Sequence, residues 1–301
     1  HHLRDLVTEA DVVLLVGNRT NQNGTDSWKL YPKDARYIQI DIDGEEIGRN
    51  YEALRLAGDA KLALAALTGE LKKRDLTRRQ AGRKALEDKI AEGHAKFLAG
   101  SEALRTSSRS PIRPERLMEE LAPRLRADDI VVADASYSSI WISNYLVAEE
   151  TGQRFLTPRG LAGLGWGLPM AMGAKVGNPD KRIICLAGDG GFAHCWVELE
   201  TARRMGLAVT LMVLNNQILG YQKHAESLRF GMHTDAVHFE PVDHAAIARA
   251  CGLPGIRVER VDEIGPALDE ALANQSQTTL IDVMTDPDAH PPITLFEDLQ
   301  N

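Results

Sequence analysis

The residue types best suited to chemistry lie in two short polar turns of the chain. Residues 188–191 place Asp189 among three glycines, and residues 215–218 open with two asparagines. Each turn directly follows an apolar run that is typical of a buried strand. Carboxylate, amide and carbonyl oxygens are the ligands that Mg2+ prefers, commonly together with phosphate groups. We therefore predict a magnesium ion bound by Asp189, the side-chain amide of Asn216 and the backbone carbonyl of Ile218, with diphosphate oxygens and water completing its shell.

The first turn also has the composition of a phosphate site. Gly188, Gly190 and Gly191 would let the backbone approach a ligand closely. A helix predicted over residues 192–205 would direct free amides and the positive end of its dipole at a diphosphate. Either turn alone is common in loops. The pair is specific because each turn ends a predicted strand and 24 residues separate Gly190 from Asn215.

The elements that must position these turns belong to residues 114–301, where predicted strands and helices alternate as in a doubly wound parallel sheet. The predicted strands cover residues 130–133, 182–187, 209–214 and 279–283. A helix begins at Pro114 and places Leu117, Leu121 and Leu125 on one stripe. In such sheets ligands bind beyond the carboxyl ends of the strands, which is where both turns fall.

The first part of the chain reads differently. Residues 1–70 predict strands at 11–16 and 37–42 and then a helix, too little for a stable open sheet alone, so we expect them to be part of a larger domain. Residues 71–113 are rich in Lys and Arg and predict a helical linker. This linker is either a basic patch for an acidic ligand or a solvated connecting helix, and we favour the second.

Composition narrows the class of protein. The 301 residues suffice for about two domains. A net charge of −8 argues against a general nucleic-acid binder, which needs a basic face to contact phosphates. Three cysteines, an odd number without metal-site spacing, indicate reduced thiols. The sequence has neither an apolar run of about 18 residues nor a signal-peptide pattern. We expect a cytoplasmic protein without a membrane span or a nucleic-acid partner.

The paired turns resemble the thiamine-diphosphate motif of the acetolactate synthase and pyruvate decarboxylase superfamily. Residues 158–169 are similar to the acetolactate synthase segment around the cofactor's pyrimidine ring, and Asp134 followed by Trp141 also matches. Between those two the family usually has Gly-Gln-His near the diphosphate, where this chain has residues 136–138, whose amides and hydroxyls can still contact phosphate. The cofactor contacts assigned from the turns and the resemblance are Ser136, Tyr137, Ser138, Ala162, Gly163, Leu164, Gly188, Gly190, Gly191, Asn216, Ile218, Leu219, Gly220 and Tyr221.

The resemblance also implies how the cofactor is bent. The Ala162 carbonyl and the Leu164 amide would hold the pyrimidine ring, and the Leu164 side chain would wedge under the cofactor. Four glycines between residues 160 and 167 independently predict a close backbone approach, with Leu164 as the bulky exception. Ordinary core packing of Leu164 is the alternative. The family's catalytic Glu lies in an amino-terminal domain donated by a partner subunit, and no residue of this chain matches it.

Residues 1–70 are similar to the end of the family's Rossmann-like middle domain, through residues 17–19 and 40–48. In acetolactate synthases this domain holds a flavin that takes no part in turnover. Here residues 20–23, Thr-Asn-Gln-Asn, replace the usual aromatic and acidic run. The replacement argues against FAD without excluding it, and the domain would then serve as scaffold.

The resemblance implies an enzyme dependent on thiamine diphosphate and Mg2+ that decarboxylates a 2-keto acid and joins the product to an acceptor. It would be a homodimer or homotetramer, with the partner's N-terminal pyrimidine-binding domain completing the site. Ala225 and Tyr221 replace the family's Trp and Met in the substrate pocket, which favours a larger or more polar keto acid. A non-oxidative decarboxylase and a non-catalytic protein that retains the fold remain alternatives. A nicotinamide dehydrogenase is disfavoured because the turn at Gly188 lacks the Gly-x-Gly-x-x-Gly spacing.

Overall fold

The chain folds into two compact units, His1–Ser101 and Glu102–Asn301. Their structure is a computed structural model, which describes residues 4–293. No helix among these described residues is long and apolar enough to cross a membrane.

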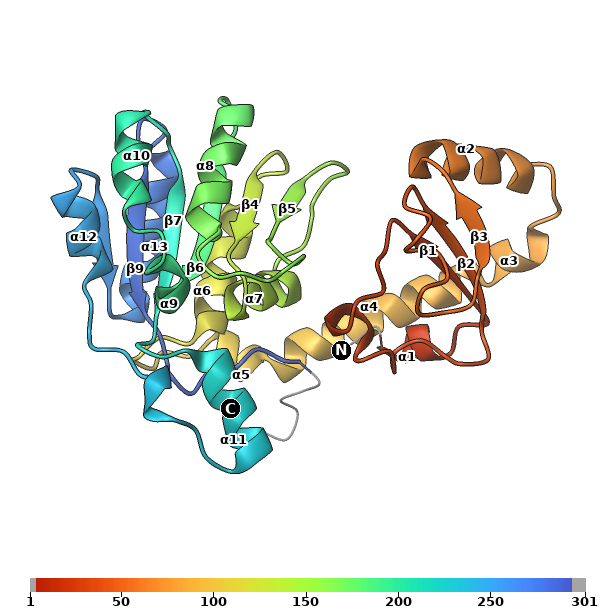
Figure 1. Ribbon diagram of the computed structural model, residues 1–301, viewed down its shortest axis with the longest axis horizontal. Helices are drawn as coiled ribbons and strands as arrows, with labels where there is room; N and C mark the ends of the chain where they lie inside the picture. The colour runs from red at the N-terminus through yellow and green to blue at the C-terminus, as the bar shows by residue number, and fades with distance from the viewer. Residues whose placement is uncertain (1–3, 294–301) are drawn as a thin grey trace. The chain divides into compact units, whose positions relative to one another are not determined.

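The smaller unit contains a three-stranded parallel sheet in the order β1-β2-β3 (Figure 1). Its strands are β1 (Val12–Val16), β2 (Arg36–Asp41) and β3 (Leu54–Ala57). Its helices are α1 (Arg4–Thr8), α2 (Ala60–Leu71), α3 (Thr77–Ala81) and α4 (Arg83–Gly100). Asp59 caps α2 by accepting a hydrogen bond from the amide of Leu62 at 2.9 Å. The two strands expected from the sequence are present to within one residue, and β3 was not predicted.

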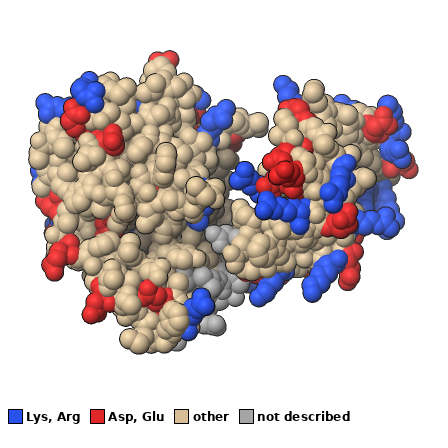
Figure 2. Space-filling model, in the orientation of Figure 1, with Lys and Arg blue, Asp and Glu red and all other residues tan. Residues whose placement is uncertain are grey.

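The basic residues of the segment after α2 lie on solvated helices. None of the residues of α4 is buried. Arg83 pairs with Glu87 at 2.7 Å and Lys84 pairs with Asp88, each one helical turn apart. Acidic and basic side chains lie interspersed on the face of the molecule drawn in Figure 2. These pairings favour the solvated helix over a basic patch for an acidic ligand.

The larger unit is built on a six-stranded sheet, all parallel, in the order β5-β4-β6-β7-β9-β8. Its strands are β4 (Ile130–Ala133), β5 (Arg154–Leu156), β6 (Ile183–Gly188), β7 (Thr210–Asn215), β8 (Gly255–Val258) and β9 (Thr279–Met284). Its helices are α5 (Glu102–Arg105), α6 (Pro114–Leu121), α7 (Tyr137–Tyr145), α8 (Gly167–Gly177), α9 (Asp189–Phe192), α10 (Glu198–Arg204), α11 (Gly220–Phe230), α12 (His244–Ala250) and α13 (Val261–Ala273). The predicted doubly wound α/β fold is confirmed.

Helices cover both faces of this sheet (Figure 1). Alternate residues of β6 enter two separate cores: Ile184 and Leu186 pack with α6, α7 and α13, whereas Ile183, Cys185 and Ala187 pack with α8, α10 and α12. Because side chains alternate across a strand, a strand buried on both faces must be apolar throughout. In β6 this requirement leaves the first polar side chain, Asp189, just beyond the strand end.

Two expectations for the helices need correction. Of the helix predicted over residues 192–205, only α10 is a continuous helix, because α9 ends at Phe192 and residues 193–197 form turns. Between α9 and α10 amides bond three residues back rather than four, as from Cys195 to Phe192 at 2.9 Å and from Leu199 to Trp196 at 3.0 Å. Similarly, Leu125 lies outside α6, because Pro123 falls in the 3-10 turn Ala122–Arg124 that follows the helix.

The sheet core should account for much of the larger unit's stability. Leu186 is fully buried, whereas Val176 on α8 is 58% exposed. Leu186→Ala should lower the free energy of unfolding by about 2–5 kcal/mol, since it leaves a cavity that the sheet cannot fill. Val176→Ala should change it by less than about 0.5 kcal/mol. Urea unfolding measures both, and equal losses would contradict this account of the core.

Candidate functional site

The two polar turns are in direct contact. They end the neighbouring strands β6 and β7, in which Gly188 pairs with Leu214. The Asp189 carboxylate accepts a hydrogen bond from the backbone amide of Gly190 at 2.8 Å and another from that of Gln217 at 2.6 Å. Gln217 adopts a left-handed conformation with φ of +59°, which turns its amide towards Asp189. The structure thus brings together the two turns that the sequence paired.

Asp189 is a buried acid without a cationic partner. It is 6% exposed, and no Lys, Arg or His of the described segment lies within ion-pairing distance of it. Burial raises the pKa of Asp189 to about 6, although the amides of Gly190 and Gln217 oppose this shift. A carboxylate in this position would be stabilised by a cation, so the site fits the predicted metal.

Asn216 and Ile218 complete the predicted metal turn. The Asn216 amide oxygen accepts a hydrogen bond from the Ile218 amide at 3.3 Å, and the Ile218 carbonyl accepts one from Gly220 at 2.9 Å. No group of three or more His, Cys, Asp or Glu side chains among residues 4–293 could hold a metal. A cation here would therefore depend on amide, carbonyl and phosphate oxygens in addition to Asp189, as Mg2+ sites commonly do.

The glycines of the first turn are required mainly by protein packing. A Cβ atom on Gly191 would lie 2.2 Å from a carboxylate oxygen of Asp134, and one on Gly190 would lie 2.8 Å from Leu219. A Cβ on Gly188 would meet only ordinary contact, 3.8 Å from the Ser138 hydroxyl. The expectation that these glycines admit a ligand therefore finds spatial support only at Gly188.

Asp134 connects the turn after β6 to the segment assigned to the pyrimidine ring. One carboxylate oxygen accepts the amides of Trp166 and Gly167 at 3.1 and 3.2 Å, and the other accepts the amide of Gly165 at 3.0 Å. Its own neighbour, Ala135, donates a further bond at 2.9 Å. The sequence singled out Asp134 only through the family pattern, and its role as an anchor for the 165–167 backbone was missed.

The pyrimidine segment itself presents apolar side chains to the surface of the chain. Leu164 is 38% exposed, Trp166 is 60% exposed and Leu161 is fully exposed. Leu164 therefore does not pack in this chain's own core, which removes the core-packing alternative. Ala162 has a φ of +55°, so its peptide is turned as few non-glycine residues allow. Gly163 lies between Ala162 and Leu164, and a Cβ atom on Gly163 would meet only the Trp166 indole at 3.5 Å.

Residues 136–138 lie beside both turns. Ser136 has φ of +67° and ψ of −143°, a conformation that favours glycine, which is the residue the family has here. The ring of Tyr137 is so close to Gly220 that a Cβ there would lie 3.1 Å from it. Ser138 is buried and faces Gly188. The carboxyl ends of β4, β6 and β7 therefore meet around these residues.

A buried Tyr–His pair adjoins this meeting point. The Tyr137 hydroxyl and Nδ1 of His224 share a hydrogen bond of 2.6 Å, and their rings stack. Burial lowers the pKa of His224 to about 4, with smaller lowering contributions from His290 and Lys223. No motif in the sequence marks His224, so this residue was missed.

The predicted substrate-pocket residues lie on the first turns of α11. The Tyr221 ring packs edge-on against Tyr137, with centroids 5.8 Å apart. Ala225, one turn further, is half-buried against the core of the sheet. Leu219, just before the helix, donates its amide to the carbonyl of Val237 at 2.8 Å. Tyr221 and Ala225 are four residues apart on α11, so they share one face of the helix, and both pack partly against the same core.

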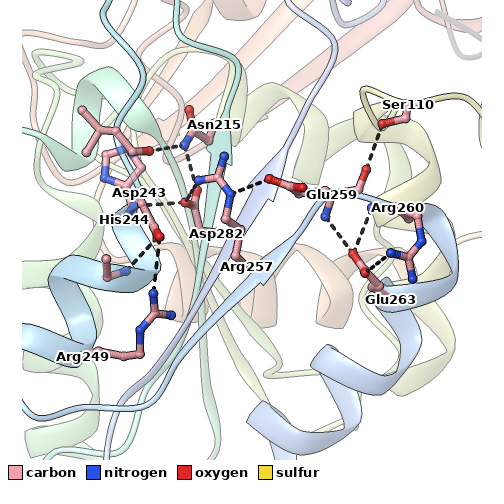
Figure 3. Close-up of polar contacts among 12 residues, drawn as sticks. Ser110, Asn215, Asp243, His244, Arg249, Arg257, Glu259, Arg260, Glu263 and Asp282 are labelled. Atoms are coloured by element: carbon pink, nitrogen blue, oxygen red, sulfur yellow. Dashed lines mark hydrogen bonds and ion pairs between the residues drawn. The ribbon is translucent and has the colours of Figure 1, made fainter.

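A buried polar network binds Asn215, the first residue of the second turn (Figure 3). Asp282 on β9 is fully buried and accepts hydrogen bonds from the Asn215 side chain at 2.9 Å, the His244 amide at 3.0 Å and the Arg257 guanidinium at 3.0 Å. Asn215 also donates to the carbonyl of Val242 at 2.8 Å. Asn215 is therefore fixed by protein partners, which leaves Asn216 facing the metal turn.

In the smaller unit, the segment that replaces the flavin motif folds on itself. Thr20 is buried with φ of +50°, and its carbonyl accepts hydrogen bonds from Asn50 at 3.1 Å and from the Trp28 indole at 2.9 Å. Gln39 of β2 donates to the carbonyl of Asn18 at 3.1 Å. These bonds secure the loop through its own residues.

Comparison with protein families agrees with this geometry. Residues 134–283 match the model of the thiamine pyrophosphate enzyme C-terminal TPP binding domain, and residues 1–67 match the thiamine pyrophosphate enzyme central domain. Thiamine pyrophosphate is another name for thiamine diphosphate. The chain belongs to the family of thiamine pyrophosphate enzymes.

Within this family the chain is similar to relatives that are named for two different activities. It is 30% identical over 295 residues to a probable acetolactate synthase large subunit of Methanococcus aeolicus, covering 93% of this chain and 48% of that protein. It is 30% identical over 311 residues to a sulfoacetaldehyde acetyltransferase of Roseovarius nubinhibens, covering 96% and 51%. It is 28% identical over 284 residues to the acetolactate synthase large subunit of Haemophilus influenzae, covering 94% and 48%. The chain spans about half the length of these relatives.

The Asp134 anchor can be tested by removing its charge. Asp134→Asn places an amide donor where backbone amides already donate, so it should lower the free energy of unfolding by about 1–3 kcal/mol. It should also weaken binding of magnesium thiamine diphosphate, because residues 165–167 lose their support. Urea unfolding and calorimetric titration measure the two effects. Asp180→Asn, at an exposed site, is the matched control and should change neither; an Asp134 variant that behaves like it would refute the anchor.

The buried His224 predicts a dependence of stability on pH. With a pKa of about 4 in the folded chain and its ordinary value of 6.5 when unfolded, His224 takes up a proton on unfolding between these values. Its contribution to stability is thus complete above pH 6.5 and is lost as the pH falls towards 4, at up to about 1.4 kcal/mol per pH unit. His224→Asn should flatten this part of the stability curve. An unchanged slope would mean that His224 does not stay neutral.

Proposed function

We propose that the protein is a thiamine-diphosphate- and Mg2+-dependent enzyme that decarboxylates a 2-keto acid and joins the product to an acceptor. The observation that carries the proposal is the contact between Asp189 and the backbone of Gln217. This contact places a buried acid without a counter-ion beside Asn216, at the strand ends of a thiamine-pyrophosphate-binding domain. The membership of the chain in the family supports the same conclusion.

We assign the metal to Asp189, the Asn216 side chain and the Ile218 carbonyl. The diphosphate would be held by residues 136–138 and by the turn at Gly188. The pyrimidine ring would lie against residues 162–164, with the exposed Leu164 side chain beneath the cofactor. When bound, thiamine diphosphate supplies a nucleophilic carbon and an electron sink. We propose that residues 114–301 carry this site. Residues 71–113 would connect them to residues 1–70.

No acid of this chain matches the family's catalytic Glu, so we propose that a partner subunit provides it in a homodimer or homotetramer. The exposed Leu161, Leu164 and Trp166 would then face that subunit. We propose the smaller unit as scaffold, because its loop at Thr20 is secured by protein hydrogen bonds rather than left open for FAD.

A second candidate is transfer of an acetyl group to a small polar acceptor. The relative from Roseovarius nubinhibens carries the name sulfoacetaldehyde acetyltransferase. The polar Tyr221 favours a polar acceptor over a second keto acid with an apolar side chain. Simple decarboxylation without an acceptor and a non-catalytic binding role are the remaining alternatives.

The proposal is tested by adding thiamine diphosphate and Mg2+ to the full protein and screening 2-keto acids, alone and with aldehyde acceptors. Carbon dioxide release together with a ligated product supports the carboligase. Carbon dioxide with a free aldehyde supports the decarboxylase, and cofactor binding without turnover of any keto acid supports a binding role. Absence of cofactor binding would refute the proposal.

Asp189→Ala should abolish retention of the cofactor. Without the carboxylate, few protein oxygens remain to bind Mg2+, so neither the ion nor the diphosphate should be held. Calorimetric titration of magnesium thiamine diphosphate into the variant measures the loss, and Asp180→Ala at an exposed site is the control. Unchanged affinity in Asp189→Ala would show that the metal lies elsewhere.

A further inference from the structure

Arg159 is a half-buried cation that touches the candidate site. It follows strand β5 by three residues and reaches across to the start of α7. Its Nη2 atom donates to the carbonyl of Ser136 at 3.3 Å and to the hydroxyl of Ser139. The Ser139 hydroxyl in turn donates to the Ser136 carbonyl at 2.8 Å. The guanidinium is thus held by the same backbone that is assigned to the cofactor.

The charge of Arg159 has no acid to balance it. No Asp or Glu within residues 4–293 lies within 4 Å of its guanidinium, and its two hydrogen bonds go to a neutral carbonyl and a neutral hydroxyl. Two more deeply buried arginines of the larger unit are paired, Arg113 with Glu115 at 2.8 Å and Arg182 with Asp129. Burial lowers the pKa of Arg159, as expected for a cation that has lost water without gaining an anion.

Part of the Arg159 guanidinium makes no hydrogen bond within residues 4–293. Arg159 uses Nη2 for its bonds to Ser136 and Ser139, and the planar group carries further N–H donors on Nε and Nη1. The Tyr221 ring packs against Tyr137, which directly follows the Ser136 carbonyl that Arg159 binds. Arg159 and Tyr221 therefore both lie beside residues 136–138.

We propose that Arg159 binds the oxyanion of a small molecule seated beside Ser136, through the guanidinium donors that Ser136 and Ser139 leave unused. Two sources have this chemistry: the terminal phosphate of thiamine diphosphate, or an acid group of the substrate or acceptor. The inference rests on the proposed function for the identity of these two molecules. A guanidinium suits either source, because its planar fork matches the oxygens of carboxylate, sulfonate and phosphate.

The experiment follows the modification of Arg159 by phenylglyoxal, measured by mass spectrometry on the full protein. Four conditions are compared: Mg2+ alone, Mg2+ with inorganic pyrophosphate, Mg2+ with thiamine diphosphate, and the last with pyruvate or sulfoacetate added. Arg154, exposed at the start of β5, is the internal reference and should react equally in all four. Protection of Arg159 by pyrophosphate or thiamine diphosphate identifies the phosphate as the source. Protection that appears only with pyruvate or sulfoacetate identifies the acid group.

Variants separate ionic contact from simple shielding. Arg159→Gln should weaken binding of the protecting probe by about tenfold or more, as loss of a charge-assisted hydrogen bond does. Arg159→Lys should recover part of that affinity, because it keeps the charge although it loses the fork. Arg154→Gln is the matched control and should bind within twofold of the parent protein.

Two results would overturn the inference. One is modification of Arg159 at the same rate in all four conditions. The other is an Arg159→Gln variant that binds every probe within twofold of the parent, which would leave Arg159 only a structural tie between the loop and α7. A parent protein that does not bind thiamine diphosphate would instead contradict the proposed function, so the two failures are distinguishable.

Discussion

The carboxylate of Asp134 is the constraint on which the candidate site depends. It lies at the carboxyl end of β4, accepts the amides of residues 165–167, and occupies the space that a side chain on Gly191 would need. Three segments far apart in the sequence are thereby held together around one buried group. A carboxylate can do this because backbone amides satisfy its charge without a cation. The backbone of residues 165–167 and the turn at Asp189 are consequently held close together.

Three buried acids of the larger unit are compensated in three different ways. Asp134 is surrounded by amides, and Asp282 is paired with Arg257 and bound to Asn215. Asp189 has two amides and no cation, and its pKa is raised to about 6. Asp134 and Asp282 bind backbone and side-chain donors of the protein, whereas the charge of Asp189 is only partly compensated. This difference in compensation is the reason why we propose Asp189, and not Asp134 or Asp282, as the acid that binds a ligand.

The sequence predicted the sheet and the proximity of the two polar turns, because both follow from local patterns. Buried parallel strands must be apolar, so their ends are marked by the first polar residues, and Asp189 and Asn216 stand at two such ends. The edge strands β5 and β8 were missed because β5 has only three residues and β8 contains Arg257. The predicted helix after Gly191 was too long, because the spacing of Phe192, Cys195 and Leu199 fits both an α-helix and tighter turns.

Side chains that act through distant partners could not be predicted in the same way. Asp282 looks like an isolated acid in an apolar strand until β7 places Asn215 beside it. His224 and Arg159 show no motif, and their importance follows from Tyr137 and Ser136, which lie 87 and 23 residues away in the chain. The composition of the first turn led us to expect that its glycines admit a ligand, but two of them are explained by packing against Asp134 and Leu219.

The central claim is that Asp189 and Asn216 bind a divalent cation together with a diphosphate at the ends of β4, β6 and β7. The most direct measurement is a crystal structure of the full protein with thiamine diphosphate and Mn2+, whose anomalous scattering locates the ion. We expect the ion to contact the side-chain oxygens of Asp189 and Asn216 and the diphosphate. We expect the pyrimidine ring to lie beside Leu164. An ion bound away from Asp189, or a diphosphate bound away from these strand ends, would contradict it.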